Sequence, residues 1–308
     1  MKGFKGISDS LSLGASTVSV ARQAAETVTE LLTEMKGKIV AAQESNVDRD
    51  KIQTDIDKLI GQIDSVVGAA QFNGLNMVNS TGDVDILSSL DRSSTGSVKA
   101  STITVARQDL SIGEYTGKAA FAGTTGASTD NDAAVMSLAK ADTTGVELVL
   151  DSGVTYAAGD SISLTLGDKT VSYTVSAEDA AQTPAALTNL IGAGLKSAVD
   201  AMGITDLRVD FAANDGTDET TLTFKAADTD GDTATSLAKD LTIAAQFKNA
   251  GSGGLGLLDT IDVTNTGDPA MALANIETMI QTAVDAASEF GAAEKQIGIQ
   301  ADFIGKTG

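Results

Sequence analysis

The segment with the clearest potential for chemistry is an acidic turn at positions 228–232, which reads Asp-Thr-Asp-Gly-Asp. Carboxylates at alternate positions begin an EF-hand calcium loop, which also needs Gly at its sixth position and Glu at its twelfth. Here the glycine is fourth and the twelfth position is Lys239, so an EF-hand is excluded. A looser calcium site with oxygen ligands stays open beside the simpler interpretation, a solvated acidic turn.

A glycine-rich segment and two carboxylate pairs are the other places where the sequence could support chemistry. Positions 251–256 resemble a phosphate-binding loop but lack the following Lys-Ser/Thr and a preceding apolar strand, so a flexible linker is expected there. The pairs 178–179 and 218–219 bring two carboxylates together, as glycosidases do. Adjacent side chains point apart, however, and both pairs lie beside turn residues, which indicates solvated loop charge.

Composition excludes several classes of function. The 308 residues contain no Cys and no His, which removes thiol nucleophiles, Cys/His zinc sites and histidine bases. The net charge of −21 opposes contact with nucleic-acid phosphates or anionic membranes, and positions 110–260 alone carry 21 acidic and 8 basic residues. No apolar run approaches the roughly 20 residues of a membrane helix. We therefore expect neither an enzyme nor a protein that binds a cofactor, nucleic acid or a membrane interior, and we assign no metal site, with calcium at the acidic turn left open.

The elements that must position any functional surface are long helices at both ends of the chain. Apolar residues recur in alternating steps of four and three over positions 7–42, again over 52–70, and again over 273–304. These are heptad seams. Their main predicted members are Leu11, Val18, Val28, Leu32, Met35, Ile39, Ile56, Leu59, Ile63, Ile276, Ile280, Phe290 and Ile297.

A long helix with one narrow apolar seam is stabilised mainly by packing against partners. We therefore expect helices at 5–43, 47–70 and 270–304 to pack as an antiparallel coiled-coil rod built from both chain ends. The predicted class is α+β. The predicted regions are an N-terminal half of the rod with a hairpin, an inserted β-rich domain, and a C-terminal helix that completes the rod, at 1–110, 111–264 and 265–308.

The middle of the chain shows the alternation of strands. Two alternating runs around Gly167-Asp168 predict a hairpin, an apolar helical pattern follows, and two more strands flank Asn-Asp-Gly at 214–216. This predicts a hairpin, a helix and a second hairpin. The ranges are 161–166, 170–175, 184–202, 206–211 and 220–224, with further strands at 98–106, 146–150 and 241–247.

A four-residue motif after the second helical run connects the chain to a known family. It consists of Gln71, Phe72, Asn73 and Gly74, in which Asn-Gly allows the positive φ angles that reverse a chain. With the long heptad helix before it, the motif resembles bacterial flagellin. The run at 268–304 is similar to the C-terminal rod helix of flagellins, and the stretch 161–225 resembles an insert of flagellins and hook-associated proteins.

The resemblance implies a structural subunit of the bacterial flagellar filament, exported to the cell exterior, self-assembling there and supporting motility. Its implied partners are other flagellin subunits, a flagellar export chaperone and the filament cap, with a glycan as a further possibility. Flagellins carry further terminal segments that build the filament. We therefore expect this chain to be a core fragment that lacks both segments and does not polymerise alone.

Two other functions stay open at this stage. A surface adhesin or glycan-binding protein would use the middle domain, with Lys225, Lys239 and Lys248 as basic contacts in an otherwise acidic region. A hook–filament junction protein would share the rod. The complete motif at 71–74 favours flagellin over the junction protein.

Overall fold

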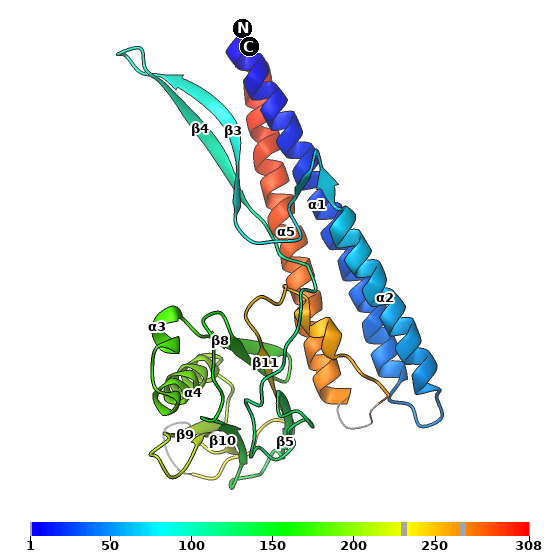
Figure 1. Ribbon diagram of the computed structural model, residues 1–308, viewed down its shortest axis with the longest axis vertical. Coiled ribbons are helices and arrows are strands. Elements are labelled where there is room, and N and C mark those ends of the chain that lie inside the picture. The colour runs from blue at the N-terminus through cyan, green and yellow to red at the C-terminus, as the bar shows by residue number, and fades with distance from the viewer. Residues whose placement is uncertain (1, 229–232, 265–268, 308) are drawn as a thin grey trace.

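The computed structural model describes residues 2–228, 233–264 and 269–307. The chain has the expected α+β class, with long helices and several antiparallel sheets. Figure 1 shows long helices running the length of the molecule and a β-rich body beside one end of them. The two chain ends lie together at the opposite end. Within the described residues, no helix combines the length and the apolar character that a membrane crossing requires.

The three long helices are α1 (Lys2–Ala41), α2 (Arg49–Ala69) and α5 (Pro269–Thr307). The reversal between α1 and α2 follows from local hydrogen bonding. Asp48 caps α2 by accepting from the backbone N–H of Lys51 at 3.1 Å. Arg49 donates from Nε to the carbonyl of Ala42 at 2.9 Å, which satisfies an acceptor beyond the end of α1. In Figure 1, α5 lies beside α1 along its length, and α2 lies beside the second half of α1.

A small turn and a long hairpin follow α2. The turn joins β1 (Gln71–Phe72) to β2 (Leu75–Asn76), and the hairpin joins β3 (Asp83–Arg92) to β4 (Val98–Ala106). The β3 strand contacts α1, where Ile86 lies over Gly14. A Cβ atom at position 14 would come within 2.6 Å of the Ile86 side chain, so the glycine in this seam position admits the hairpin.

The β-rich body contains two sheets. One has the strand order β5-β11-β7-β8 and the other has the order β6-β10-β9. All pairs are antiparallel. The bounds are β5 (Ala133–Leu138), β6 (Val146–Leu150), β7 (Ser161–Leu166), β8 (Lys169–Thr174), β9 (Leu207–Ala212), β10 (Thr220–Ala226) and β11 (Leu241–Lys248), with α3 (Ala177–Ala180), α4 (Pro184–Ala201) and the 3-10 helix η1 (Gly256–Thr260).

Both predicted hairpins of the middle region are present, with α4 between them. They belong to different sheets, however, and α4 packs against β8, β9 and β10. Two glycines of α4 permit this close packing. A Cβ atom at Gly192 would lie 2.8 Å from Thr220, and one at Gly194 would lie 2.4 Å from the ring of Tyr173.

Two large hydrophobic cores divide the molecule. The first joins α1, α2, α5 and the β3–β4 hairpin, and the second fills the β-rich body. The first core also contains residues that flank the middle region, namely Leu110, Ile112, Leu255, Leu258 and Ile261. It therefore reaches several residues beyond the predicted limits of the inserted domain.

The prediction of a flexible linker at 251–256 was wrong. Gly253 donates to the carbonyl of Ile112 at 3.1 Å, and Leu255 donates to the carbonyl of Ser111 at 3.0 Å. A Cβ atom at Gly254 would lie 1.8 Å from the carbonyl oxygen of Asp109. The glycines are needed because two backbone segments pass in contact here, and this contact fixes the segment instead of freeing it.

Candidate assembly surface

The predicted seam residues lie in the first hydrophobic core, so they hold the chain together internally. In α1, Leu11, Val18, Val28, Leu32, Met35 and Ile39 are each at most 1% exposed. In α2, Ile56, Leu59 and Ile63 are buried, and in α5 so are Ile276, Phe290 and Ile297. A surface that contacts another molecule must therefore be formed by other faces of these helices.

Of the α5 residues predicted for the seam, Ile280 is the one that does not occupy the core. Ile280 is only half-buried, and the neighbouring Met279 is 2% exposed and occupies the core position. Glu294, a polar residue in an otherwise apolar run, accepts from Nε of Arg22 on α1 at 2.6 Å. Arg22 also bonds Glu26 at 2.8 Å, and the hydrogen bond to Glu294 is the main reason that the pKa of Arg22 is raised.

The motif at 71–74 forms a tight reversal at one end of α2. Gln71 and Phe72 of β1 pair with Asn76 and Leu75 of β2, which leaves Asn73 and Gly74 as a two-residue loop. Their φ angles are 51° and 79°, the signs that a type I′ turn requires. The reversal packs against α1 through both short strands.

An apolar groove runs between this turn, α1 and β3. Its volume is about 290 Å³, and its lining includes Leu13 and Gly14 of α1, Phe72 and Leu75 of the turn, and Ile86 of β3. Leu13 is 45% exposed and Phe72 is half-buried, so part of this apolar lining faces solvent. The groove is one place where the helical region offers apolar contact to another molecule.

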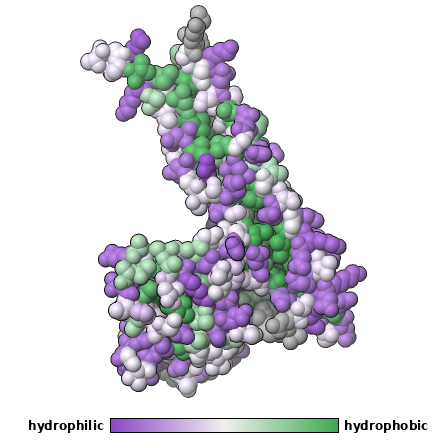
Figure 2. Space-filling model, in the orientation of Figure 1, coloured by the Kyte–Doolittle hydropathy of each residue, from purple (hydrophilic) through white to green (hydrophobic). Residues whose placement is uncertain are grey.

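Large apolar side chains on the described surface are concentrated on the long helices and the hairpin. Figure 2 shows apolar colour in stretches along this elongated part of the molecule. Eight of the nine exposed large apolar side chains lie on α1, α5 or the β3–β4 hairpin, and only Leu190 lies in the β-rich body. The eight are Phe4, Leu13, Val40, Leu90, Val98, Val284, Ile299 and Phe303. Their concentration on one part of the described surface makes this region the candidate for assembly.

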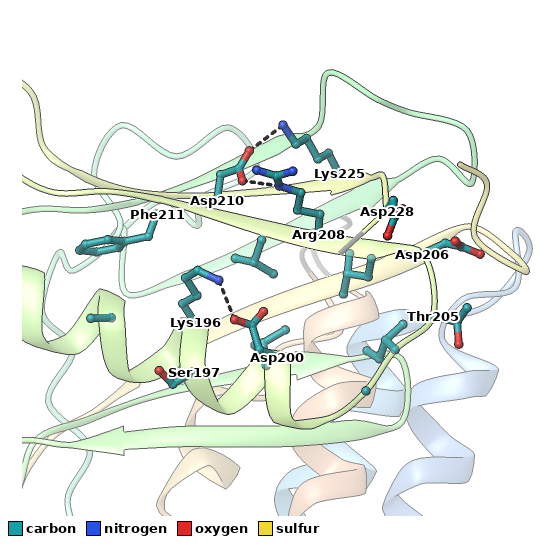
Figure 3. A pocket seen from close by; sticks show the side chains of 16 residues that line it. Lys196, Ser197, Asp200, Thr205, Asp206, Arg208, Asp210, Phe211, Lys225 and Asp228 are labelled. Atoms are coloured by element: carbon teal, nitrogen blue, oxygen red, sulfur yellow. Dashed lines mark hydrogen bonds and ion pairs between the residues drawn. The ribbon is translucent and has the colours of Figure 1, made fainter. Parts of the chain in front are cut away.

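The β-rich body instead presents a charged groove, which Figure 3 shows from close by. It lies between α4 and the outer strand β9 and has a volume of about 1210 Å³. Asp210 accepts from Nε of Arg208 at 2.8 Å and from Nζ of Lys225 at 2.6 Å, while Lys196 bonds Asp200 at 2.6 Å. The hydrogen bond from Lys225 is the main reason that the pKa of Asp210 is lowered.

A polar network fastens the β-rich body to α5. Tyr115 donates to Asp132 at 2.6 Å, Gln246 of β11 donates to the Tyr115 hydroxyl at 3.2 Å, and Asn275 of α5 donates to the Gln246 side chain at 3.2 Å. Burial is the main reason that the pKa of Tyr115 is raised, and the bond to Asp132 adds to it. Sequence inspection missed this network because its members are far apart in the chain.

The acidic motifs have structural roles where the structure describes them. Ser176 caps α3 by accepting from the backbone N–H of Asp179, and the Asp179 carboxylate accepts from the backbone N–H of Ser176. Glu219 accepts from the backbone N–H and hydroxyl of Ser152. Residues 229–232 of the possible calcium turn lie outside the described residues. In the described part of the chain, no three His, Cys, Asp or Glu side chains are grouped so that they could hold a metal ion.

Comparison with known proteins supplies the evidence on identity. Residues 1–83 match the family described as the bacterial flagellin N-terminal helical region. Flagellin C of Rhizobium meliloti (strain 1021) is 38% identical over 102 residues, which is 32% of either chain. Flagellin FljN of Caulobacter vibrioides is 36% identical over 103 residues, which is 32% of this chain and 37% of that one. The matched segment thus spans about a third of these relatives.

Solved flagellar structures were also found. FliC from Burkholderia pseudomallei has 13% sequence identity and a TM-score of 0.42, and the alignment covers 92% of this chain and 99% of that one. Flagellar hook-associated protein-3 from Legionella pneumophila has 10% identity and a TM-score of 0.42, with 99% and 93% covered.

Proposed function

We propose, from the flagellin-type N-terminal region of this chain, that it is a structural subunit of a bacterial flagellar filament. In this role it is exported, assembles outside the cell with other copies and supports motility. The observation that carries the proposal is the match of residues 1–83 to the flagellin N-terminal helical region. The concentration of exposed apolar side chains on the long helices and hairpin supports it, because a filament subunit needs such faces for its neighbours.

In this proposal the chain has two parts with different tasks. The segments 1–110 and 265–308 form an antiparallel coiled-coil rod that makes the contacts between subunits. The segment 111–264 is an inserted domain that faces solvent. Two observations support the division: the packing of α5 along α1, and the separate hydrophobic core of the β-rich body. The packing of Ile112 and Leu255 in the first core favours domain limits nearer to 113 and 252.

The further partners follow from the same assignment. An export chaperone would bind the chain before secretion, and the filament cap would receive it at the growing tip. A glycan is a possible addition to the solvent-facing part of a surface protein. Each of these belongs to the proposal as an expectation for flagellins.

The proposal is tested by the composition of the filament. Filaments sheared from cells that express this protein would be purified, and peptides of the β-rich body would be quantified by mass spectrometry. A filament subunit is expected as a major component along the whole length. Recovery of only a few copies per filament would instead indicate a hook–filament junction protein. Absence from the filament fraction, together with presence on the cell body, would support a surface adhesin.

A further inference from the structure

The outer edge of β9 is an open sheet edge of the β-rich body, and a groove runs along it. Strand β9 is terminal in its sheet and pairs only with β10 among the described strands. The edge of β5 is covered by the bridge between Ala127 and Ala134, and that of β6 by bonds between Thr124 and Val149. The charged groove, in contrast, runs along β9 and is lined by every residue from 207 to 211.

The backbone of β9 is set to accept another strand. The N–H of Ala227 donates to the carbonyl of Asp206 at 3.1 Å, and the two strands are antiparallel. In such a ladder, alternate residues direct both backbone groups toward the partner. The even-numbered residues of β9 therefore face β10, and Val209 and Phe211 direct their N–H and C=O groups outward into the groove. Edge groups without a backbone partner in the described part of the chain are a template for strand addition.

The side chains of β9 are complementary to those of a second β9. The strand reads Leu-Arg-Val-Asp-Phe over 207–211. If two copies pair antiparallel about a two-fold axis at Val209, Arg208 of each copy lies opposite Asp210 of the other. Opposite charges placed directly across a strand pair are favourable, and like charges are not. On the other face of the same pair, Leu207 lies opposite Phe211, so the register matches apolar with apolar residues.

The surroundings of the edge also suit a second copy of this acidic chain. The segment 110–260 carries 21 acidic and 8 basic residues, and three of the eight basic residues, Lys196, Arg208 and Lys225, line this one groove. Repulsion between copies is therefore weaker here than over the rest of the body. The groove wall formed by α4 includes the small side chains of Ala193 and Ser197 beside the ion-paired Lys196 and Asp200.

We propose that the β-rich bodies of two copies of this chain associate through antiparallel pairing of their β9 strands, centred on Val209. The pairing extends the sheet β6-β10-β9 across the two-fold axis into the sheet of the other copy. It is a weak contact for free chains, because a net charge of −21 opposes association. The contact does not depend on the filament assignment.

Register-specific disulfide cross-linking tests the pairing. Because the chain has no native cysteine, only the introduced cysteines can form disulfides. Arg208→Cys and Asp210→Cys would be prepared separately, concentrated, mixed in equal amounts and oxidised. The proposed register places position 208 opposite 210 of the other copy, whereas 208 and 208 lie too far apart for a disulfide. We expect the mixed disulfide to exceed either single-variant disulfide by about tenfold.

The matched control is Thr223→Cys, on the central strand β10 and on the same half-buried face as Asp210. Neighbouring strands flank it on both sides, so its disulfide should stay at the level of random collision. Circular dichroism would establish that each variant is folded. Mixed and single-variant disulfides in the proportions of random collision would overturn the pairing. Because purified chains are used, this result does not depend on whether the protein is a filament subunit.

Charge exchange supplies a second test without cysteine. Arg208→Glu places like charges opposite each other in a pair of identical copies, and so does Asp210→Lys. We expect sedimentation at high concentration to detect self-association of the unchanged chain, and each variant alone should lose it. No self-association of the unchanged chain at high concentration would overturn the proposal. Mixing the two variants restores an attractive pair, and association should return. Association of either variant alone at the level of the unchanged chain would contradict the proposed register.

Discussion

The long helices and the β-rich body differ in how much apolar surface they expose to solvent. The helical region buries its seam residues internally, yet it still exposes eight of the nine large apolar side chains on the described surface. The β-rich body buries its apolar residues in its own core, and acidic residues outnumber basic ones in this part of the chain. Exposed apolar surface has a cost in water unless a partner covers it. The difference supports the proposal that neighbouring molecules cover the helices, while most of the surface of the body faces water.

The largest expected effect comes from a substitution in the buried core of the helical region. Leu32→Asp places a charge at a position with 0% exposure between the long helices. We expect this region to unfold, with a loss of more than about 4 kcal/mol, because a buried charge without a partner is among the most damaging changes. Leu13→Asp is the control on the same helix, and at 45% exposure it should change stability little. Thermal melts followed by circular dichroism at 222 nm compare the two variants. An equal fall in melting temperature for both would show that Leu32 is not part of the buried seam.

The second prediction separates the two regions at the segments that join them. A chain in which Gly113 is joined to Ser252, its bridge partner, keeps Leu110, Ile112 and Leu255 in the first core. It should show a helical spectrum and a cooperative melt. A chain that joins Ala106 to Thr264 loses these residues and Leu258, and should melt at a distinctly lower temperature. Equal melting temperatures would show that the flanking segments contribute nothing to the helical region.

The third prediction uses alkaline pH to weaken one region and spare the other. Tyr156 and Tyr173 belong to the core of the β-rich body, Tyr115 lies where that body joins the helices, and all three have a raised pKa. Burial is the main cause in each, and it raises the pKa of Tyr173 to about 12. A group whose folded pKa is raised contributes stability that is present below its unfolded pKa of about 10 and is lost as pH rises through the folded pKa.

We therefore expect near-UV circular dichroism, which reports the tyrosines, to show unfolding at lower pH than the helical signal at 222 nm. Between the unfolded pKa of a tyrosine and its higher folded pKa, ionisation in the unfolded chain lowers the free energy of unfolding by up to about 1.4 kcal/mol per pH unit. Tyr115→Phe should reduce this slope. Coincident transitions at both wavelengths would mean that the two regions unfold as one unit.

The smallest predicted effects concern two glycines of α1, whose replacement by alanine should change the stability of the chain in opposite directions. Gly14→Ala brings a methyl group against Ile86 and should destabilise the chain by about 1 kcal/mol, since the hairpin must shift. Gly37→Ala meets nothing within 4 Å and should stabilise the helix by about 0.5–1 kcal/mol. Urea unfolding of both variants measures the difference. Stabilisation by both changes would show that Ile86 does not fix the hairpin on α1.

Local patterns in the sequence predicted the features that local physics determines. The heptad pattern predicted the bounds of the long helices to within a few residues. Asn73 and Gly74 adopt the positive φ angles that such a pair permits. The class was predicted correctly as α+β. The sequence pattern did not predict the order of the strands or β5, because sheet neighbours such as β5 and β11 are far apart in the chain.

Features that depend on contact between distant segments were missed or misread. The partner of Glu294 is Arg22, at the other end of the chain, and no local pattern connects them. The glycines at 253 and 254 were taken for a flexible linker, whereas they allow backbone contact with positions 109–112. Composition alone cannot distinguish a glycine that frees the chain from one that lets another segment approach. The charged groove along β9 likewise exists only once α4 has packed beneath the sheet.

Antibody access on intact filaments tests the division between the two regions most directly. One antibody would recognise the β-rich body around Leu190, and another the exposed face of α5 around Val284 and Ile299. Immunogold electron microscopy should show the first antibody along the whole filament, and the second only after the filaments are dissociated into subunits. Labelling of intact filaments by the α5 antibody, or no labelling by the Leu190 antibody, would contradict the assignment of the helices to assembly and the body to solvent.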